Sequence, residues 1–332
     1  VDSGSTLALA ATGNADILGL SVGVAGAGGG AGLLSLTAAV IANTTRAAVS
    51  GKVEDDDSIT QSDIDANGAV TLSARDNSEI NTLAIGVSAA GGGALGAAAV
   101  ANVIANVTEA EISNSTVDAD STLEMEALSS SVIRSLAIGV AGSGGYGLSF
   151  TGMGNGVANR TSAAIIGSTV TAADDVTLAA AEQDLNAEDF LDAVRSFVPD
   201  NDNDPDDADS KTSLQSLTAA LDGTPLDLDA NIASVAVNVA GAGGAAVGVV
   251  LVGNDVSNSV TTAITDSTVV SASGDVLLDS DSNASVAALT VGVAGAGGVA
   301  VNATGFGNVI ANTTSATISD HSTVTTVSGG VS

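Results

Sequence analysis

The feature that most constrains this chain is a short run of alternating large and small residues that occurs five times. It reads Ser-Val-Gly-Val-Ala-Gly-Ala-Gly-Gly at residues 21–29, and related runs lie at 84–92, 137–145, 236–244 and 290–298. The anchor valines of these runs are 63, 53, 99 and 54 residues apart: Val24, Val87, Val140, Val239 and Val293. A long period predicts an array of similar units that cover one another's apolar faces. We therefore expect about five 53-residue repeats with one short and one long insertion.

Asn-x-Thr triplets form a second recurring marker. They begin at Asn43, Asn106, Asn159 and Asn312. Each is formally a glycosylation acceptor. Their recurrence at one position of the repeat favours a turn instead, because Asn tolerates a left-handed backbone and Thr forms local hydrogen bonds.

The uncharged runs predict strands rather than helices. The run at 83–107 could pass for an alanine-rich helix or a membrane span, but its counterpart at 146–156 contains four glycines and that at 247–252 is rich in valine. A helix would lose roughly 1 kcal/mol at each glycine, whereas β-branched residues favour strands. The sequence thus predicts an all-β fold, a parallel β-solenoid (β-helix), with about two coils in each repeat.

Alternation along these strands separates large residues from small ones. Leu83, Ile85 and Val87 share one face, and Ala84, Gly86 and Ser88 share the other. Because neither face carries charge, we expect both to be buried. With 40 glycines, no tryptophan and 2% aromatic residues, the core must be thin.

Charge and cysteine content exclude several classes of protein. The formal net charge is −31, with only seven Lys plus Arg, so we expect no nucleic-acid partner and consider a membrane surface unfavourable. The chain has no cysteine, which removes disulfides and thiolate chemistry.

Residues 181–230 differ from the rest of the chain. They contain all three prolines and have apolar residues at helical spacing in 188–198. We expect repeats one to three at 1–180, an acidic helical-hairpin insertion at 181–230, and repeats four and five at 231–332.

An acidic loop in this insertion is a candidate calcium site, because hard cations prefer several oxygen ligands. Pro205 and Lys211 replace the glycine and glutamate of an EF-hand loop, so a solvated acidic hairpin is the alternative. Residues 55–57, also acidic, are expected to form a solvated tip. The candidate ligands are Asp200, Asp202, Asp204, Asp206, Asp207 and Asp209.

Nothing in the sequence predicts catalysis. His321 is the only histidine, and no nucleophile and base accompany it at a recurring position. The glycine runs, such as 26–30, lack the Lys-Ser/Thr ending of a phosphate-binding loop. We expect no enzyme activity.

Three motifs together resemble the repeat regions of giant bacterial filamentous adhesins, the haemagglutinin-like and leukotoxin-like large exoproteins. They are Gly-Val-Ala-Gly-Ala-Gly-Gly at 23–29 and 292–298, Val-Ile-Ala-Asn-Thr-Thr at 40–45 and 309–314, and Ser-Thr-Val followed by a turn and Val-Thr-Leu. The resemblance implies a secreted or cell-surface β-helical stalk and no catalytic residue.

We therefore expect a structural segment of an extracellular filament or adhesin stalk. Its partners would be copies of itself or flanking repeats, with a cell-surface glycan or protein as receptor. The chain begins and ends within a repeat, which predicts a window from a longer protein or a subunit that stacks end to end. The alternatives are a membrane-inserting, glycine-rich segment of a toxin-like exoprotein and a solenoid face that binds glycan or ice.

Overall fold

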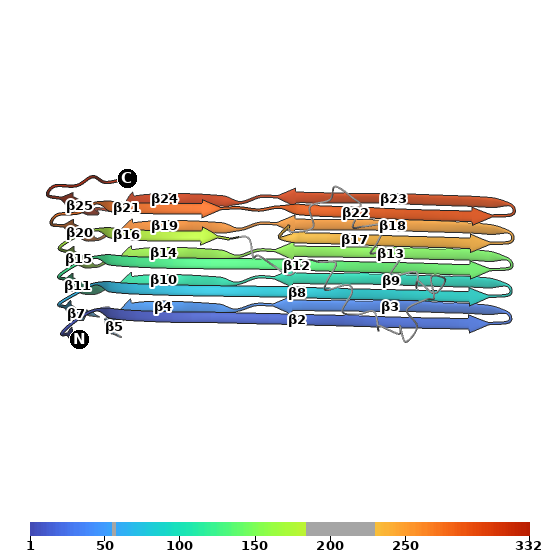
Figure 1. The fold of residues 1–332 in the computed structure, drawn as a ribbon, viewed down its shortest axis with the longest axis horizontal. Helices are drawn as coiled ribbons and strands as arrows, with labels where there is room; N and C mark the ends of the chain where they lie inside the picture. Colours follow the sequence, from blue (N-terminus) through green and yellow to red (C-terminus); the bar gives the residue numbers. More distant parts are fainter. Residues whose placement is uncertain (55–57, 184–229) are drawn as a thin grey trace, which may run out of the picture.

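The computed structural model describes residues 1–54, 58–183 and 230–332, and these residues form strands, turns and bends without a helix. Nearly all the strands are parallel and belong to stacked sheets, the arrangement of a β-solenoid (Figure 1). The all-β prediction is confirmed. The predicted helical hairpin and its aspartates lie outside the described residues, apart from the margins of 181–230.

Each coil follows the same path. In the second coil, β8 (Val70–Ala90) runs to a Gly-Gly turn and β9 (Gly93–Ile104) returns beside it. After a break at residues 105–106, β10 (Val107–Ser113) continues in the same direction, and β11 (Ser115–Ala119) closes the coil.

Corresponding strands of successive repeats are direct neighbours. Val87 pairs with Val24 on one side and with Val140 on the other. Each repeat therefore makes one coil, and the expectation of two coils is wrong, because a 21-residue strand such as β8 uses much of the repeat. At about 4.8 Å for each strand, the five-stranded return sheet is about 24 Å wide.

Four parallel sheets contain most of the strands. The forward sheet contains β2 (Leu7–Ala27), β8, β12 (Leu123–Ser143), β16 (Val176–Glu182), β17 (Ile232–Ala242), β21 (Val276–Ser282) and β22 (Val286–Ala296). The return sheet contains β3 (Gly30–Ile41), β9, β13 (Tyr146–Val157), β18 (Ala245–Val256) and β23 (Val299–Ile310). A third sheet contains β4 (Thr44–Ser50), β10, β14 (Arg160–Ile166), β19 (Ser259–Thr265) and β24 (Thr313–Ser319).

The fourth sheet is built from short strands at the end of the coil farthest from the Gly-Gly turns. It contains β1 (Asp2–Ser3), β7 (Ser62–Ala66), β11, β15 (Thr169–Ala172), β20 (Thr268–Ser271) and β25 (Thr323–Thr326). An antiparallel pair, β5 (Lys52–Val53) and β6 (Ile59–Thr60), precedes β7.

The proximal half of the molecule, which contains the third and fourth sheets, has an apolar interior. Side chains of one kind stack in columns from coil to coil, such as Leu9, Leu72, Met125, Leu178 and Leu278. Such columns merge into the largest hydrophobic cluster of the structure. This burial stabilises the solenoid, since each coil covers the apolar side chains of the next.

The distal half, between the third sheet and the Gly-Gly turns, is a thin slab of forward and return strands. Inward residues there are mostly small: a Cβ on Gly96 would collide with the carbonyl oxygen of Val140 on the opposite sheet. The turn between the sheets is only two residues long, as at Gly91-Gly92, so the sheets must lie close together. The predicted thin core is confirmed.

The large residues of the distal half point outward. In the first coil, Val22 and Val24 are 57% and 75% exposed. In the second coil, Ala84, Gly86 and Ser88 are buried, while Ile85 and Val87 are only partly so. The expectation that both faces are buried therefore holds at Leu83, which is 2% exposed, but is wrong at Ile85 and Val87, because the close approach of the sheets leaves room mostly for small residues between them.

Left-handed backbone occurs at the turn before the fourth sheet. Asn114, Gly167 and Asp266 have φ of 48°, 58° and 48°, and the last coil has Asp320 and His321 at 50° and 59°. The Asn-x-Thr triplets have no left-handed residue, so that part of their predicted role is wrong. Their asparagines lie at the break between the return strands and the third sheet.

Candidate functional site

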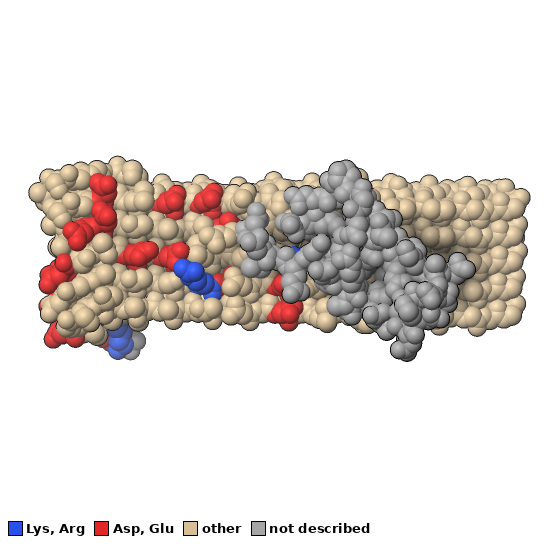
Figure 2. All heavy atoms as spheres, viewed as in Figure 1, with Lys and Arg blue, Asp and Glu red and all other residues tan. Residues whose placement is uncertain are grey.

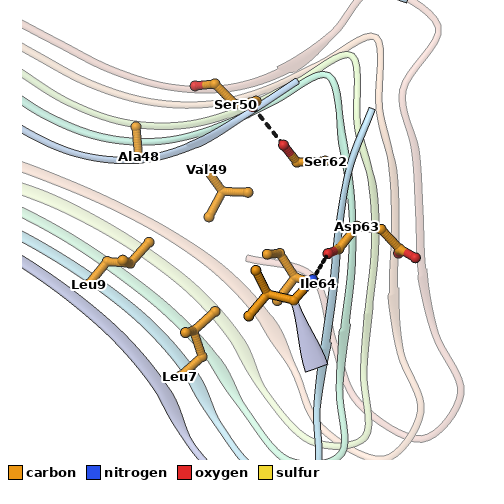
Figure 3. A pocket seen from close by; sticks show the side chains of 9 residues that line it. Leu7, Leu9, Ala48, Val49, Ser50, Ser62, Asp63 and Ile64 are labelled. Atoms are coloured by element: carbon orange, nitrogen blue, oxygen red, sulfur yellow. Dashed lines mark hydrogen bonds between the residues drawn. The ribbon is translucent and has the colours of Figure 1, made fainter. Parts of the chain in front are cut away.

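The two ends of the stack are open. Beside the first coil, a hollow of about 460 Å³ is lined by residues that include Leu7, Leu9, Val49 and Ile64 (Figure 3). Beside the last coil, a hollow of about 240 Å³ is lined by residues that include Leu278, Ile318 and Val331. Both hollows expose the same proximal core that is buried in the middle coils.

The open ends carry matching apolar side chains. Strand register connects Leu9 to Leu278 and Ile17 to Val286 through the coils between them, whereas Val276, in the column of Leu7, already pairs with Val331. Ile41 and Val49 are connected in the same way to Ile310 and Ile318. The last coil could therefore receive a first coil as its next neighbour.

An asparagine ladder follows the break between the return strands and the third sheet. The side-chain oxygen of Asn106 accepts from the backbone N–H of Asn43 at 2.9 Å, and that of Asn159 accepts from the N–H of Asn106 at 3.1 Å. Asn258 and Asn312 continue the series at 3.0 Å each. The ladder satisfies backbone donors where the strand is interrupted.

A second polar ladder lies inside the distal slab. The Asn155 side chain accepts from Asn102 and Ser135, each at 2.9 Å, and donates to Ser234 at 2.8 Å and to Asn254 at 3.1 Å. These residues are nearly inaccessible to solvent. The slab thus has hydrogen-bonded polar residues inside, next to an apolar cluster that includes Val100, Met153 and Val252, while many of its apolar residues point outward.

Two carboxylates are buried next to the first ladder. Asp76 accepts hydrogen bonds from Asn106 at 2.7 Å, Ser78 at 2.8 Å and Thr45 at 3.0 Å. Glu182 accepts from Thr161 at 2.7 Å and Asn159 at 3.2 Å. Burial raises the pKa of Glu182 to about 7, although these hydrogen bonds act in the opposite direction.

Stability should therefore fall as pH rises from about 4.5 to above 7. Glu182 binds its proton more tightly in the folded state than in the unfolded state. Ionisation of Glu182 therefore lowers the free energy of unfolding, by roughly 3 kcal/mol at most. We expect Glu182→Gln to remove most of this decline. The measurement is urea unfolding between pH 5 and pH 8, with Glu124→Gln, at an exposed site on β12, as control. Equal pH dependence of the Glu182 variant and the control would contradict the assignment.

Charged side chains of the described residues gather toward the proximal half, as Figure 2 shows for one face. Some form ion pairs between neighbouring coils: Arg46 with Glu111 at 2.8 Å, and Arg134 with Glu79 at 2.7 Å. Within the described ranges, no cluster of three or more His, Asp or Glu could hold a metal ion.

The residues singled out from the sequence do not come together. His321 is exposed at a left-handed turn, and the candidate calcium ligands lie outside the part of the chain described. The sequence analysis did not identify Asp76 and Glu182. They lie in one column of the stack, and in the other coils this column contains the small residues Gly13, Ser129 and Ser282. A carboxylate in a column of small residues is the signal that could have identified them.

Long apolar helices are also absent from the described residues, so none of those residues belongs to a helix able to cross a membrane. Comparison with known proteins gives no relative: no family model, no curated protein and no solved structure matches this chain.

Proposed function

We propose that this chain is a structural repeat segment of an extracellular bacterial filament or adhesin stalk, and that its coils stack end to end on further coils. The observation that supports this most directly is the match between the two open ends. Leu9, Ile17 and Ile41 at one end occupy the same columns as Leu278, Val286 and Ile310 at the other.

Stacking would extend two interactions that already exist between coils. The first is parallel strand pairing, which β2, β3 and β4 in the first coil and β22, β23 and β24 in the last coil leave unsatisfied on one edge of their sheets. The second is burial of the apolar columns. A head-to-tail contact of this kind does not close, so it produces a fibre.

The finer features expected from the sequence belong to the same proposal. They are an array of about five 53-residue repeats, an acidic helical hairpin at 181–230 that binds calcium, and the resemblance to filamentous adhesins. The motifs at 23–29, 40–45 and 309–314 support the resemblance, and the aspartates of residues 200–209 support the calcium site.

Proline at the free edge tests the stacking. The backbone N–H of Leu7 donates to Ala69 in the second coil, so in an extended strand the N–H of Ala8 points to the open side. Ala8→Pro should keep every existing hydrogen bond, since edge strands tolerate proline, but should block addition of a coil.

We expect the unmodified chain to form fibres with a repeat of about 4.8 Å along the axis, and Ala8→Pro to remain as short particles with an unchanged circular dichroism spectrum. Electron microscopy and light scattering measure this. Ala8→Thr, which retains the N–H, is the matched control. Fibres that persist in the proline variant, or none from the unmodified chain at high concentration, would refute end-to-end stacking.

A further inference from the structure

The outward surface of the return sheet, here named the return face, consists of the outward residues of β3, β9, β13, β18 and β23. They form six columns across the coils: the column of Gly93 lies beside the turns, and the other five are at the positions of Leu95, Ala97, Ala99, Ala101 and Val103 in β9. Asp255 is the only charged residue among these columns, and it lies in the last of them.

This face is too large to be an incidental patch. Five strands of 12 residues cover about 40 Å by about 24 Å, or about 950 Å². Exposed apolar patches on soluble monomers usually measure about 300–600 Å², whereas each partner of a stable protein pair contributes about 800 Å². Leu34, Leu148 and Leu251 remain 61%, 47% and 53% exposed on it.

The pattern of large and small residues is complementary to itself. Consider a two-fold axis parallel to the coil axis that passes over the central column of Leu36, Ala99, Gly152, Leu251 and Gly305. In each strand, this axis places the residue two positions before the central column of one copy opposite the residue two positions after the central column of the other copy. The facing pairs become Leu34 with Ala38, Phe150 with Gly154, and Val249 with Gly253.

The outer columns follow the same rule in two coils. Gly32 faces Val40 in the first coil, and Leu148 faces Gly156 in the third. A Cβ at Gly154, Gly156 or Gly253 would stand in open space, so these glycines leave hollows on the outer surface. In the first, third and fourth coils, bulky side chains of a second copy can therefore enter hollows of the first, as an isologous interface requires.

Charge favours this arrangement as well. The axis turns the second copy end for end along the strand direction, so the two acidic proximal halves lie at opposite ends of the pair. This limits repulsion between two chains that each carry a formal charge of −31.

Lipid fits the return face less well than a second copy does. The chain has no tryptophan and one tyrosine, although aromatic residues normally mark both borders of a membrane-embedded surface.

We infer that the return face binds a second copy of this chain through this two-fold axis, with the coil axes of the two copies parallel. Because the coils of both copies advance in the same direction, the pair is compatible with stacking of each copy into a fibre. The interface thus predicts filaments made of two laterally joined solenoids.

The test uses sedimentation of the chain carrying Ala8→Pro, so that end-to-end growth does not interfere. We expect a dimer. Leu251 lies on the axis and meets its own mate, so Leu251→Asp should weaken association about 100-fold or more, as expected for a central buried position. Leu20→Asp is the control, because Leu20 is 55% exposed but belongs to the forward sheet.

Side-chain exchange tests the pairing itself. Gly154→Phe should abolish association, because each new ring would meet Phe150 of the other copy. Phe150→Gly combined with Gly154→Phe should restore it, since the exchange recreates a large-to-small pair. Simple loss of folding cannot produce this rescue.

Cross-linking gives a second readout, because the chain has no cysteine of its own. Leu251→Cys should yield a covalent dimer with a short bis-maleimide, and Leu20→Cys should not. A monomer at high concentration, dissociation by Leu20→Asp instead of Leu251→Asp, or flotation of the chain with phosphatidylcholine vesicles would each overturn the inference, the last in favour of lipid.

Discussion

Replacing Gly96 with valine is expected to destabilise the protein by about 3 kcal/mol, at the upper end of what overpacking usually costs. Gly96 faces into the distal slab, and a Cβ there would collide with the carbonyl oxygen of Val140 on the opposite sheet. A backbone carbonyl held in a sheet cannot move aside as a flexible side chain can. The two sheets would have to separate, which also disturbs the polar ladder between them.

Gly142→Val is the matched control for this prediction. Gly142 also lies in a slab strand, but it points outward and a Cβ on it would meet nothing within 4 Å. Valine should be neutral or slightly stabilising there, because β-branched residues favour strands. Urea unfolding of both variants measures the difference, and equal stability would show that the sheets are not in close contact.

Removal of the Asn155 side chain is expected to cost about 3 kcal/mol as well. Asn155 links Asn102 and Ser135 on one side to Ser234 and Asn254 on the other through four hydrogen bonds. Asn155→Ala leaves some of these buried groups without a partner, and each such group costs about 1–3 kcal/mol.

Asn308→Ala is the control for the ladder. Asn308 occupies the same column in the last coil and accepts from Asn254 at 2.9 Å, but it is exposed. Water can replace its lost hydrogen bond, so we expect less than about 1 kcal/mol. If thermal or urea unfolding gave equal losses for the two variants, the inner ladder would not have the stabilising role assigned to it.

Parallel stacking of the repeats could be predicted because five runs of similar sequence must adopt one structure. Glycines of the run at 146–156 excluded a helix for all of them. The number of coils in each repeat was not predictable in this way. It depends on the length of β8 and its counterparts, and strands of 21 residues exceed what a pattern of alternation alone suggests.

The inward face of the slab was the main feature that sequence reasoning missed. Large apolar residues such as Ile85 and Val87 would ordinarily be placed inside, yet here Gly86 and Ser88 are buried instead. Asparagine at positions 102, 155, 254 and 308 was an available signal, because a polar residue that recurs in one column can form a continuous ladder only inside a stack.

Of the two candidate functional surfaces, the sequence predicted the open ends of the stack but not the return face. The repeats predicted end-to-end stacking, and the column that connects Leu9 to Leu278 supports that proposal. The return face could not be foreseen, since the pairing of Phe150 with Gly154 depends on both residues pointing outward from the same strand.

By itself, the sequence determined the class of fold, the equivalence of the repeats and the scarcity of material for a thick core, because these follow from periodicity and residue size. Only the tertiary structure decided which side of each strand is inside. In the distal half, both sides of the strands are largely uncharged, so hydrophobicity does not distinguish them. Two-residue turns bring the sheets so close that steric fit overrides the preference for burying large side chains.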